Sequence, residues 1–269
     1  MATLEPQIGP SAPHMLAVGE GEALRRIAYR YRAAPAGAPA RPTVVWLGGF
    51  KSDMVSTKAS ALDAWAEREG RAFLRFDYSG HGESEGRFED GTIGKWLEES
   101  LAVIRMVTSG PLVLVGSSMG GWIALLVARA LAQAGEAARL AGMVLIAPAV
   151  DFTEKLMWAN FSDGIRREIA ENGFWLRPSD YSPDPYPITR ALIEDGRNHL
   201  LLDKALRSWC PVHILQGMQD PDVPWKHALA LVEHLAEDSV VLTLIKSGDH
   251  RLSTEADLER LVGAVEGAA

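Results

Sequence analysis

Short apolar runs alternate along this chain with longer segments that have the periodicity of amphipathic helices. The apolar runs cover residues 43–47, 72–76, 111–115 and 143–146. Helical patterns lie between them, over residues 56–69 and 92–107 and in a stretch that ends at Ala132. Strands that are apolar at every position are buried on both faces, which is typical of a parallel sheet with helices on each side. We therefore predict an α/β fold with a mostly parallel central sheet.

The alternation continues at both ends of the chain. An apolar run follows Pro211 directly, a second covers residues 240–245, and a helical pattern follows each of them. Thr254 has an acidic residue three positions later, which is the spacing of a capping box at the start of the last helix. Residues 25–32 alternate enough to predict an exposed edge strand, and residues 1–13 have the composition of an irregular arm.

Residues 151–209 interrupt the alternation. They hold 8 of the 20 aromatic residues, and their four prolines exclude one long helix. Because structureless loops of this length are uncommon in compact domains, we predict a small cap inserted between late strands, over the carboxyl edge of the sheet. The alternative is a long connection that its aromatic residues attach to the core. Residues 1–150 and 210–269 would then form one core domain. Candidate walls of a substrate pocket in the cap are Trp158, Phe161 and Trp175.

Charge and cysteine content exclude several classes of function. The chain has 27 Lys and Arg against 35 Asp and Glu in 269 residues, which gives a net charge of −8. This balance argues against nucleic acid as a partner, because phosphates require a basic surface, and against docking on anionic membranes. The single cysteine, Cys210, excludes both a disulfide within the chain and a cysteine-rich zinc site.

We expect a cytoplasmic protein without a membrane span. The longest apolar run, residues 140–150, is far shorter than the ~18–20 residues that cross a bilayer. The first basic residue is Arg25, and Glu5 precedes it. Such a start has neither the basic character of a secretory signal nor the arginine-rich character of a transit peptide. The sequence does not indicate an oligomeric state.

The sequence Gly116-Ser117-Ser118-Met119-Gly120 lies directly between a buried strand and a helix. In a nucleophile elbow a serine occupies a strained strand-to-helix turn, and the glycines beside it let the backbone pass without side-chain clashes. The N-terminus of the helix that follows favours a developing negative charge. Ser118 is therefore the candidate nucleophile.

A serine nucleophile requires a base, and the base requires an orienting acid. On this type of sheet the expected chain order is serine, then an acidic residue, then histidine, with the last two on loops after late strands. Asp220 follows the apolar run after Pro211, and His250 follows the run over residues 240–245. We predict these two residues as acid and base. Asp222 remains an alternative acid.

Other histidines have less suitable contexts. His213 lies inside a predicted strand, and His227 and His234 lie on one predicted helix. His81 lies in a glycine-rich loop that could border the pocket. Asp249 is adjacent to the candidate base but would point away from it if the imidazole faces the serine.

Acyl transfer also requires donors to the developing oxyanion, and the loss of one such donor costs roughly 3–4 kcal/mol. One donor is expected to be the backbone N–H of Met119, the residue after the nucleophile. The other is expected from the loop after the first buried strand, Gly48-Gly49-Phe50, where we predict the N–H of Phe50. The alternative for this loop is a simple Gly-Gly turn.

We predict no cofactor and no metal ion. Residues 80–86 have glycines that resemble a dinucleotide-binding fingerprint, but the last glycine comes one residue late and acidic residues accompany it. The sequence contains neither a phosphate-binding loop that ends in Gly-Lys-Ser/Thr nor a His-Glu-x-x-His zinc helix.

Together, the motifs LGGF, FDYSGHGES, VGSSMGGW, GMQDPDVPW and SGDHR resemble those of the α/β-hydrolase superfamily of serine hydrolases. The likeness runs from about residue 43 to the C-terminus, with the cap apart. Residues 75–80, 94–96 and 116–122 also resemble the mitochondrial palmitoyl-protein thioesterase family of animals, which is also described as having acyl-glucuronide esterase activity. The resemblance implies a catalytic triad of Ser118, Asp220 and His250. We do not extend it to an organellar location, because no transit peptide is evident.

These observations predict a serine hydrolase that cleaves small-molecule carboxylic esters or thioesters through an acyl-enzyme. The aromatic cap indicates an apolar acyl group. Two other uses of the same residues remain open, namely acyl transfer to an acceptor other than water and carbon–carbon bond hydrolysis. A protein of a different class, which binds a ligand without catalysis, fits less well because every member of the triad is present.

Overall fold

The computed structural model describes residues 12–178 and 184–268. The strands in this part of the chain are β1 (His14–Val18), β2 (Arg25–Arg32), β3 (Thr43–Leu47), β4 (Phe73–Phe76), β5 (Leu112–Ser117), β6 (Leu140–Ile146), β7 (Phe174–Arg177), β8 (Tyr186–Thr189), β9 (Val212–Gly217) and β10 (Val240–Ile245). The helices are α1 (Thr57–Arg68), α2 (Ile93–Val107), α3 (Met119–Gln133), α4 (Asp163–Asn172), α5 (Arg190–Gly196), α6 (Trp225–His234) and α7 (Glu255–Ala268). None of the helices described is both long and apolar enough to cross a membrane.

Eight strands form one sheet in the order β1-β2-β4-β3-β5-β6-β9-β10. Neighbouring strands pair in parallel along β4, β3, β5, β6, β9 and β10, whereas β2 pairs antiparallel with both β1 and β4. The predicted α/β fold with a mostly parallel sheet is thus confirmed. The prediction that residues 25–32 form an edge strand is wrong, because β1 pairs along the outer side of β2.

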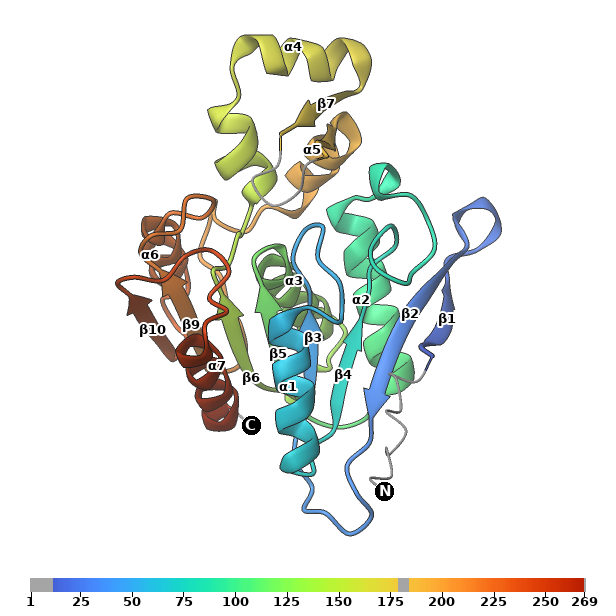
Figure 1. The fold of residues 1–269 in the computed structure, drawn as a ribbon, viewed down its shortest axis with the longest axis vertical. Helices are drawn as coiled ribbons and strands as arrows, with labels where there is room; N and C mark the ends of the chain where they lie inside the picture. The colour runs from blue at the N-terminus through green and yellow to red at the C-terminus, as the bar shows by residue number, and fades with distance from the viewer. Residues whose placement is uncertain (1–11, 179–183, 269) are drawn as a thin grey trace, which may run out of the picture.

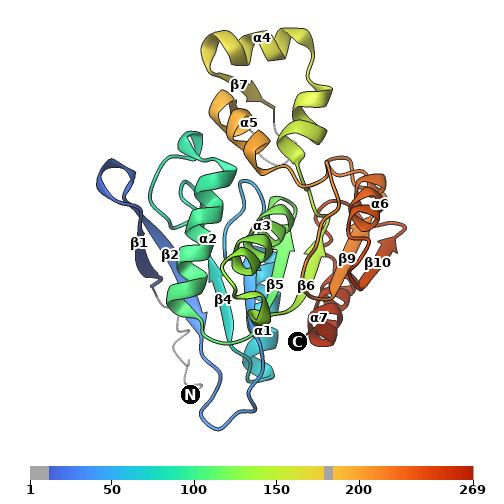
Figure 2. The same ribbon diagram turned by 180° about the vertical axis from the view of Figure 1, so that it is seen from behind.

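Helices cover both faces of the sheet. Within β3, Val45 and Leu47 belong to one apolar core, and Val44 and Trp46 belong to the other, because successive side chains of a strand point to opposite faces. The first core lies under α2, α3 and α6, and the second lies under α1 and α7 (Figures 1 and 2). Each large apolar side chain buried in this way contributes about 1.5–3 kcal/mol. The uninterrupted apolar runs of the sequence follow from this two-sided burial.

Residues 151–209 lie between β6 and β9, beyond the carboxyl ends of the central strands (Figure 1). We call them the inserted segment. They contain α4, α5 and the antiparallel pair β7 and β8, together with short helical turns around Trp158. Within the segment, the Phe161 ring packs edge-on against the rings of Trp158 and Trp175, with centroid distances of 6.4 and 5.3 Å.

Specific polar contacts close the inserted segment and join it to the core. The fully buried carboxylate of Asp151 accepts hydrogen bonds from the backbone N–H groups of Leu201 and Leu202 at 2.8–3.1 Å, so the two ends of the segment are joined to each other. The backbone N–H of Gly94, in the first turn of α2, donates to Asp195 at 2.7 Å. These contacts fix the position of the segment above the sheet.

The start of α3 approaches the end of β3 so closely that only glycine fits at position 120. A Cβ atom there would lie 2.0 Å from the carbonyl oxygen of Leu47. Gly120→Ala is therefore expected to lower the free energy of unfolding by about 3 kcal/mol, because neither backbone segment can move away easily. Gly263→Ala in α7 is the matched control, since nothing lies within 4 Å of a Cβ at that position.

The control is expected to be neutral or to raise stability by up to about 1 kcal/mol through the higher helix propensity of alanine. Both values come from urea denaturation followed by circular dichroism. Equal stability of the two variants would show that the contact between α3 and β3 is not tight.

Candidate active site

Ser118 connects β5 to α3 in a backbone conformation that is rare for a residue with a side chain. Its φ is 54° and its ψ is −117°, and such a conformation persists only where the surrounding structure holds it. The Ser118 N–H donates to the carbonyl of Ile146 at 2.8 Å, and the carbonyl of Ser118 accepts from the N–H groups of Gly121 and Ala149 at 2.9 and 3.1 Å. These bonds hold the turn, and Ser118 lines a cavity at the carboxyl edge of the sheet.

The structure brings Ser118, His250 and Asp220 together from three different loops. The Nε2 atom of His250 lies 3.1 Å from the Oγ of Ser118, and its Nδ1 atom lies 2.7 Å from Oδ2 of Asp220. The loops follow β5, β10 and β9, and parallel strands end at a common edge of the sheet. His250 therefore reaches Ser118 although 132 positions separate the two residues in the sequence.

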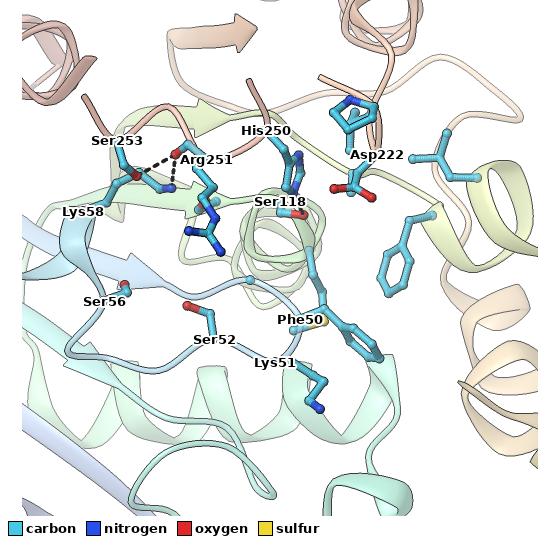
Figure 3. A pocket seen from close by; sticks show the side chains of 18 of the residues that line it. Phe50, Lys51, Ser52, Ser56, Lys58, Ser118, Asp222, His250, Arg251 and Ser253 are labelled. Carbon is cyan, nitrogen blue, oxygen red and sulfur yellow. Dashed lines mark hydrogen bonds between the residues drawn. The ribbon is translucent and has the colours of Figure 1, made fainter. Parts of the chain in front are cut away.

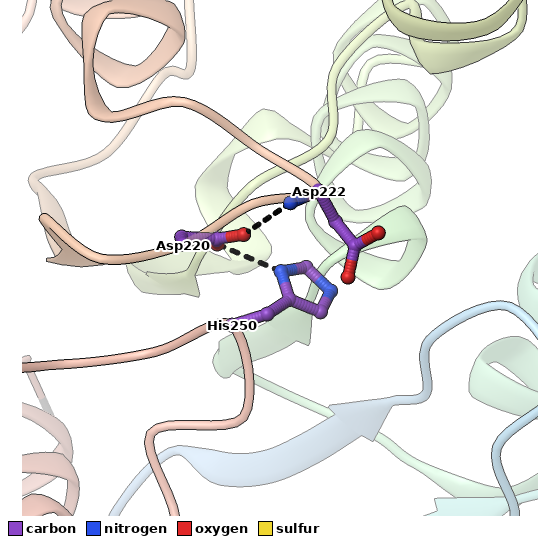
Figure 4. A group of neighbouring side chains, drawn as sticks. All are labelled: Asp220, Asp222 and His250. Atoms are coloured by element: carbon purple, nitrogen blue, oxygen red, sulfur yellow. Dashed lines mark hydrogen bonds and ion pairs between the residues drawn. The ribbon is translucent and has the colours of Figure 1, made fainter. Parts of the chain in front are cut away.

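Asp220 and Asp222 occupy different places beside the imidazole (Figure 4). The Asp220 side chain is fully buried, and its Oδ1 accepts from the N–H groups of Asp222 and Val223 at 2.8 Å. The Asp222 carboxylate lines the cavity and lies 3.9 Å from the guanidinium of Arg177. Asp220 is therefore the carboxylate bonded to Nδ1 of His250, the position of an orienting acid.

Asp220, Asp222 and His250 could also be considered as cation ligands. One ligand atom from each lies within 4.8 Å of the other two. However, both imidazole nitrogens of His250 already have hydrogen-bonding partners, Asp220 and Ser118. A bound cation would have to replace one of these bonds, so the arrangement favours proton transfer over metal binding.

The loop after β3 passes directly over the elbow. A Cβ atom at Gly49 would lie 3.3 Å from the Ser117 carbonyl and 3.4 Å from the Cβ of Ser118. Phe50 and Met119 both line the cavity at Ser118. Met119 is the first residue of α3, and the N–H groups in the first turn of a helix have no partner within the helix.

His81 holds the loop after β3 in place, a role that the sequence did not reveal. Its buried imidazole accepts a hydrogen bond at Nε2 from the backbone N–H of Lys51, at 3.1 Å, and its Nδ1 donates to the carbonyl of Ser79. Burial lowers the pKa of His81 to about 4, so that the ring is neutral and Nε2 is an acceptor at neutral pH. In the sequence, the only indication of this role is the glycine-rich pattern of residues 80–86, which places His81 in a tight turn beside Lys51.

The cavity at Ser118 has a volume of about 920 Å³ and is lined by both apolar and polar side chains. Its apolar lining includes the side chains Phe50, Phe152, Leu156, Met157 and Val223. Its polar lining includes Lys51, Asn160, Arg177 and Asp222, and also Ser52, Ser56, Lys58, Arg251 and Ser253, which lie together to one side of Ser118 in Figure 3.

Trp158, Phe161 and Trp175 are absent from the lining of this cavity, contrary to the expectation from sequence. Their rings contact one another, and the guanidinium of Arg197 lies 5.0 Å above the ring of Trp158. These partly buried rings pack against the apolar core that the inserted segment shares with the rest of the protein. Aromatic content alone could not distinguish such rings from those that face the cavity, Phe152 among them.

Comparison with known proteins identifies related sequences. The family model described as serine aminopeptidase, S33, matches residues 38–178. The mitochondrial palmitoyl-protein thioesterase ABHD10 of Bos taurus is 34% identical over 226 residues, which are 84% of this chain and 72% of that protein. Its counterpart in Mus musculus is 35% identical over 226 residues, which are 84% of this chain and 74% of that protein.

Solved structures share the fold. A protein assigned to the hydrolases, from Agrobacterium vitis S4, has a TM-score of 0.90 at 50% identity, over 95% of this chain and 98% of that one. The α/β-hydrolase domain-containing protein 10 from mouse has a TM-score of 0.81 at 30% identity, over 94% and 97%. Est1E from Butyrivibrio proteoclasticus, with ferulic acid bound, has a TM-score of 0.71 at 21% identity, over 90% and 96%, which shows the fold alone.

The expectation of a cytoplasmic location is wrong by this comparison. The five curated relatives, from cattle, mouse, orangutan, human and rat, are all named as mitochondrial proteins. The expectation rested on the lack of basic residues near the N-terminus, and this charge pattern does not by itself determine the compartment of a protein.

Sequence and structure now lead to the same family. The matched family model covers more than half of the chain, and relatives at 34–35% identity span most of it. The solved relatives at 50% and 30% identity superimpose over nearly the whole chain. The chain belongs to the α/β-hydrolase superfamily of serine hydrolases and is a hydrolase.

Proposed function

We propose that the protein cleaves carboxylic esters or thioesters with an apolar acyl group, and that the acyl group is carried on Ser118 during the reaction. The hydrogen-bonded series from Ser118 through His250 to Asp220, at 3.1 and 2.7 Å, carries this proposal. Relatives that are named palmitoyl-protein thioesterases support the same bond type.

In the proposed mechanism, the Oγ of Ser118 attacks the carbonyl carbon while Nε2 of His250 accepts its proton. His250 then donates this proton to the departing alcohol or thiol, which leaves the acyl group bonded to Oγ. A water molecule attacks the acyl-enzyme, again with His250 as base, and releases the carboxylic acid. Asp220 stabilises the imidazolium that forms in each step.

The N–H groups of Met119 and Phe50 are proposed to stabilise the oxyanion. Met119 begins α3, so its N–H coincides with the positive end of the helix dipole. Phe50 follows Gly49, at which an added Cβ atom would lie 3.4 Å from the Cβ of Ser118, and it precedes Lys51, whose N–H is bonded to His81. This bond anchors the loop that presents the second donor.

The inserted segment is proposed to act as a cap that supplies the acyl pocket. It contributes three apolar side chains to the lining of the cavity, those of Phe152, Leu156 and Met157. Each methylene group of an acyl chain that is buried there contributes about 0.8 kcal/mol. Affinity for the substrate should therefore rise with the length of the chain until the pocket is full.

The proposed triad can be tested with one pair of matched variants. Asp220→Asn is expected to lower kcat about 10⁴-fold, because the neutral amide does not stabilise the imidazolium and its NH₂ group favours the wrong tautomer of His250. Asp222→Asn, which removes a carboxylate that is not bonded to Nδ1, is expected to change kcat less than tenfold. Hydrolysis of p-nitrophenyl esters measures both.

Ser118→Ala completes this test. It is expected to abolish covalent labelling by a fluorophosphonate probe, since the labelled oxygen is removed. Full labelling or unchanged turnover in Ser118→Ala would exclude Ser118 as the nucleophile.

The acyl pocket predicts a dependence on chain length. For p-nitrophenyl esters and acyl thioesters of two to sixteen carbons, kcat/KM should rise roughly tenfold with each pair of methylene groups over the shorter lengths. Phe152→Ala and Met157→Ala should flatten this rise, because both side chains line the pocket. Trp175→Ala should retain it, because this ring lies outside the cavity lining. Indifference of the native enzyme to chain length would exclude the apolar pocket.

The anchoring role of His81 predicts a dependence of stability on pH. In the folded protein the pKa of His81 is lowered to about 4, against about 6.5 in the unfolded chain. Its neutral form thus stabilises the fold fully above about pH 6.5, and this contribution decreases as the pH falls toward 4. Between pH 6.5 and 5 the loss amounts to about 2 kcal/mol.

His81→Asn should remove this part of the pH dependence while other groups continue to titrate. The difference in unfolding free energy between native protein and variant, measured by urea denaturation at several pH values, isolates the contribution of His81. At pH 8 the variant should also have a kcat about tenfold lower, because the loop that carries Phe50 loses its anchor. A parallel pH dependence of the two proteins would contradict the assignment.

A further inference from the structure

A buried amide side chain lies at the end of β9, just before the loop that carries Asp220. Gln216 is the last residue but one of this strand, and its side chain is fully buried. Burying an amide costs free energy unless hydrogen bonds replace those that it makes to water. The steps of the proposed mechanism give this side chain no role, so its partners require an explanation.

The side-chain NH₂ group of Gln216 donates to both ends of the loop and to Asp220 itself. Its acceptors are the backbone carbonyls of Gly217 and Val223, each 3.0 Å from Nε2, and Oδ2 of Asp220 at 3.3 Å. Gly217 ends β9, and Val223 comes three positions after Asp220. Because two hydrogen atoms serve three acceptors, one of them is shared. A single side chain therefore connects both ends of the loop to the acid.

The oxygen of the same amide gains nothing from its burial. Oε1 of Gln216 has no hydrogen-bond partner in the part of the chain that the structure describes. A buried acceptor without a partner lowers stability, and an apolar side chain of the same length would avoid this cost. Turning the amide over would direct its oxygen toward three acceptors. The useful part of Gln216 is therefore its NH₂ group.

The Asp220 carboxylate accepts hydrogen bonds at both of its oxygens. Oδ1 accepts from the backbone N–H groups of Asp222 and Val223, both at 2.8 Å. Oδ2 accepts from Nδ1 of His250 at 2.7 Å and from the amide of Gln216. A carboxylate offers about four acceptor positions, so these four donors fill them. Together they fix both the place of the carboxylate and the rotation of its plane.

Without the amide of Gln216, Oδ2 of Asp220 would keep only His250 among these donors. The carboxylate could then turn about its bonds at Oδ1, and the two ends of the loop would lose their connection. Oδ2 would be aligned with Nδ1 for less of the time, so the imidazolium would be less stabilised as it forms. The chemical step would become slower while substrate binding would change little, because Gln216 is not part of the cavity lining.

We propose that Gln216 is a positioning residue, which directs Oδ2 of Asp220 toward Nδ1 of His250. It acts through Asp220 and contacts neither Ser118 nor the place of the substrate. The inference rests on the proposed function, in which Asp220 stabilises the imidazolium. It adds to the proposed triad a fourth side chain, one that lies within a strand and not on a loop.

The test begins with Gln216→Met, which keeps the length of the side chain and removes both N–H donors. With p-nitrophenyl octanoate, kcat is expected to fall about tenfold and KM to change less than about threefold. Gln219→Met is the matched control in the same loop. The Gln219 side chain is exposed, and its amide donates to the carbonyl of Lys246 rather than to Asp220. The control should keep both kinetic constants within about twofold.

A second comparison determines whether the effect passes through Asp220. In the Asp220→Asn background, Gln216→Met should change the rate less than about twofold, because the carboxylate that it positions is already absent. A general loosening of the structure would slow the reaction equally in both backgrounds. The measured rate is that of fluorophosphonate labelling at Ser118, which needs no turnover. The end point of labelling also counts the folded sites, so that kcat refers to these alone.

Gln216→Glu takes the place of Gln216→Met if the latter does not fold. It keeps the size of the side chain, and a proton shared with the neighbouring Asp220 carboxylate leaves one donor instead of two. This variant is expected to lower kcat about threefold or more, again with KM nearly unchanged.

The outcomes separate this inference from the proposed function. A native kcat in the folded Gln216 variant, or a loss no greater than that in Gln219→Met, would overturn the positioning role and leave the triad standing. Equal slowing with and without Asp220 would also overturn it. If Asp220→Asn itself leaves kcat unchanged, the proposed acid is wrong and the role of Gln216 fails with it.

Discussion

The strained turn at Ser118 depends on the parallel pairing of β5 with both of its neighbours, β3 and β6. The pairing places the carbonyl of Ile146 where it accepts the Ser118 N–H, and it places Leu47 so close to the first turn of α3 that only glycine fits at position 120. A positive φ at a serine persists because these contacts over-determine the backbone. Ser118 is thus held by the centre of the sheet rather than by its own loop.

The same edge of the sheet collects the other groups at the site. Asp220 and His250 follow neighbouring parallel strands, and the loop that carries Phe50 follows the strand on the other side of β5. His81 links this loop to the turn after β4 through the N–H of Lys51. Rigid strands therefore position groups that reside on loops, which is the usual arrangement in sheets of this type.

The inserted segment and the core both line the cavity at Ser118. The segment contributes Phe152, Leu156 and Met157 together with the polar Asn160 and Arg177, whereas the core contributes Phe50 and Val223 together with polar side chains from α1 and the loop after β10. Ser118 therefore lies in a cavity that parts of the chain distant in sequence build together.

Local patterns were sufficient to predict the α/β fold and to nominate Ser118, His250 and Asp220, with Asp222 as the alternative acid, because buried strands and elbow turns have short-range signatures. The tertiary structure places Asp220 at Nδ1 of His250 and directs Asp222 toward Arg177, a difference that two neighbouring positions in the sequence do not reveal. It also showed that the cavity is lined by Phe152 and its neighbours, and not by Trp158, Phe161 and Trp175. The outer strand β1 and the hydrogen bond between His81 and Lys51 likewise became evident only in the structure. Periodicity along a chain records which side chains are buried, but which groups meet in a cavity depends on the packing of segments that are distant in sequence.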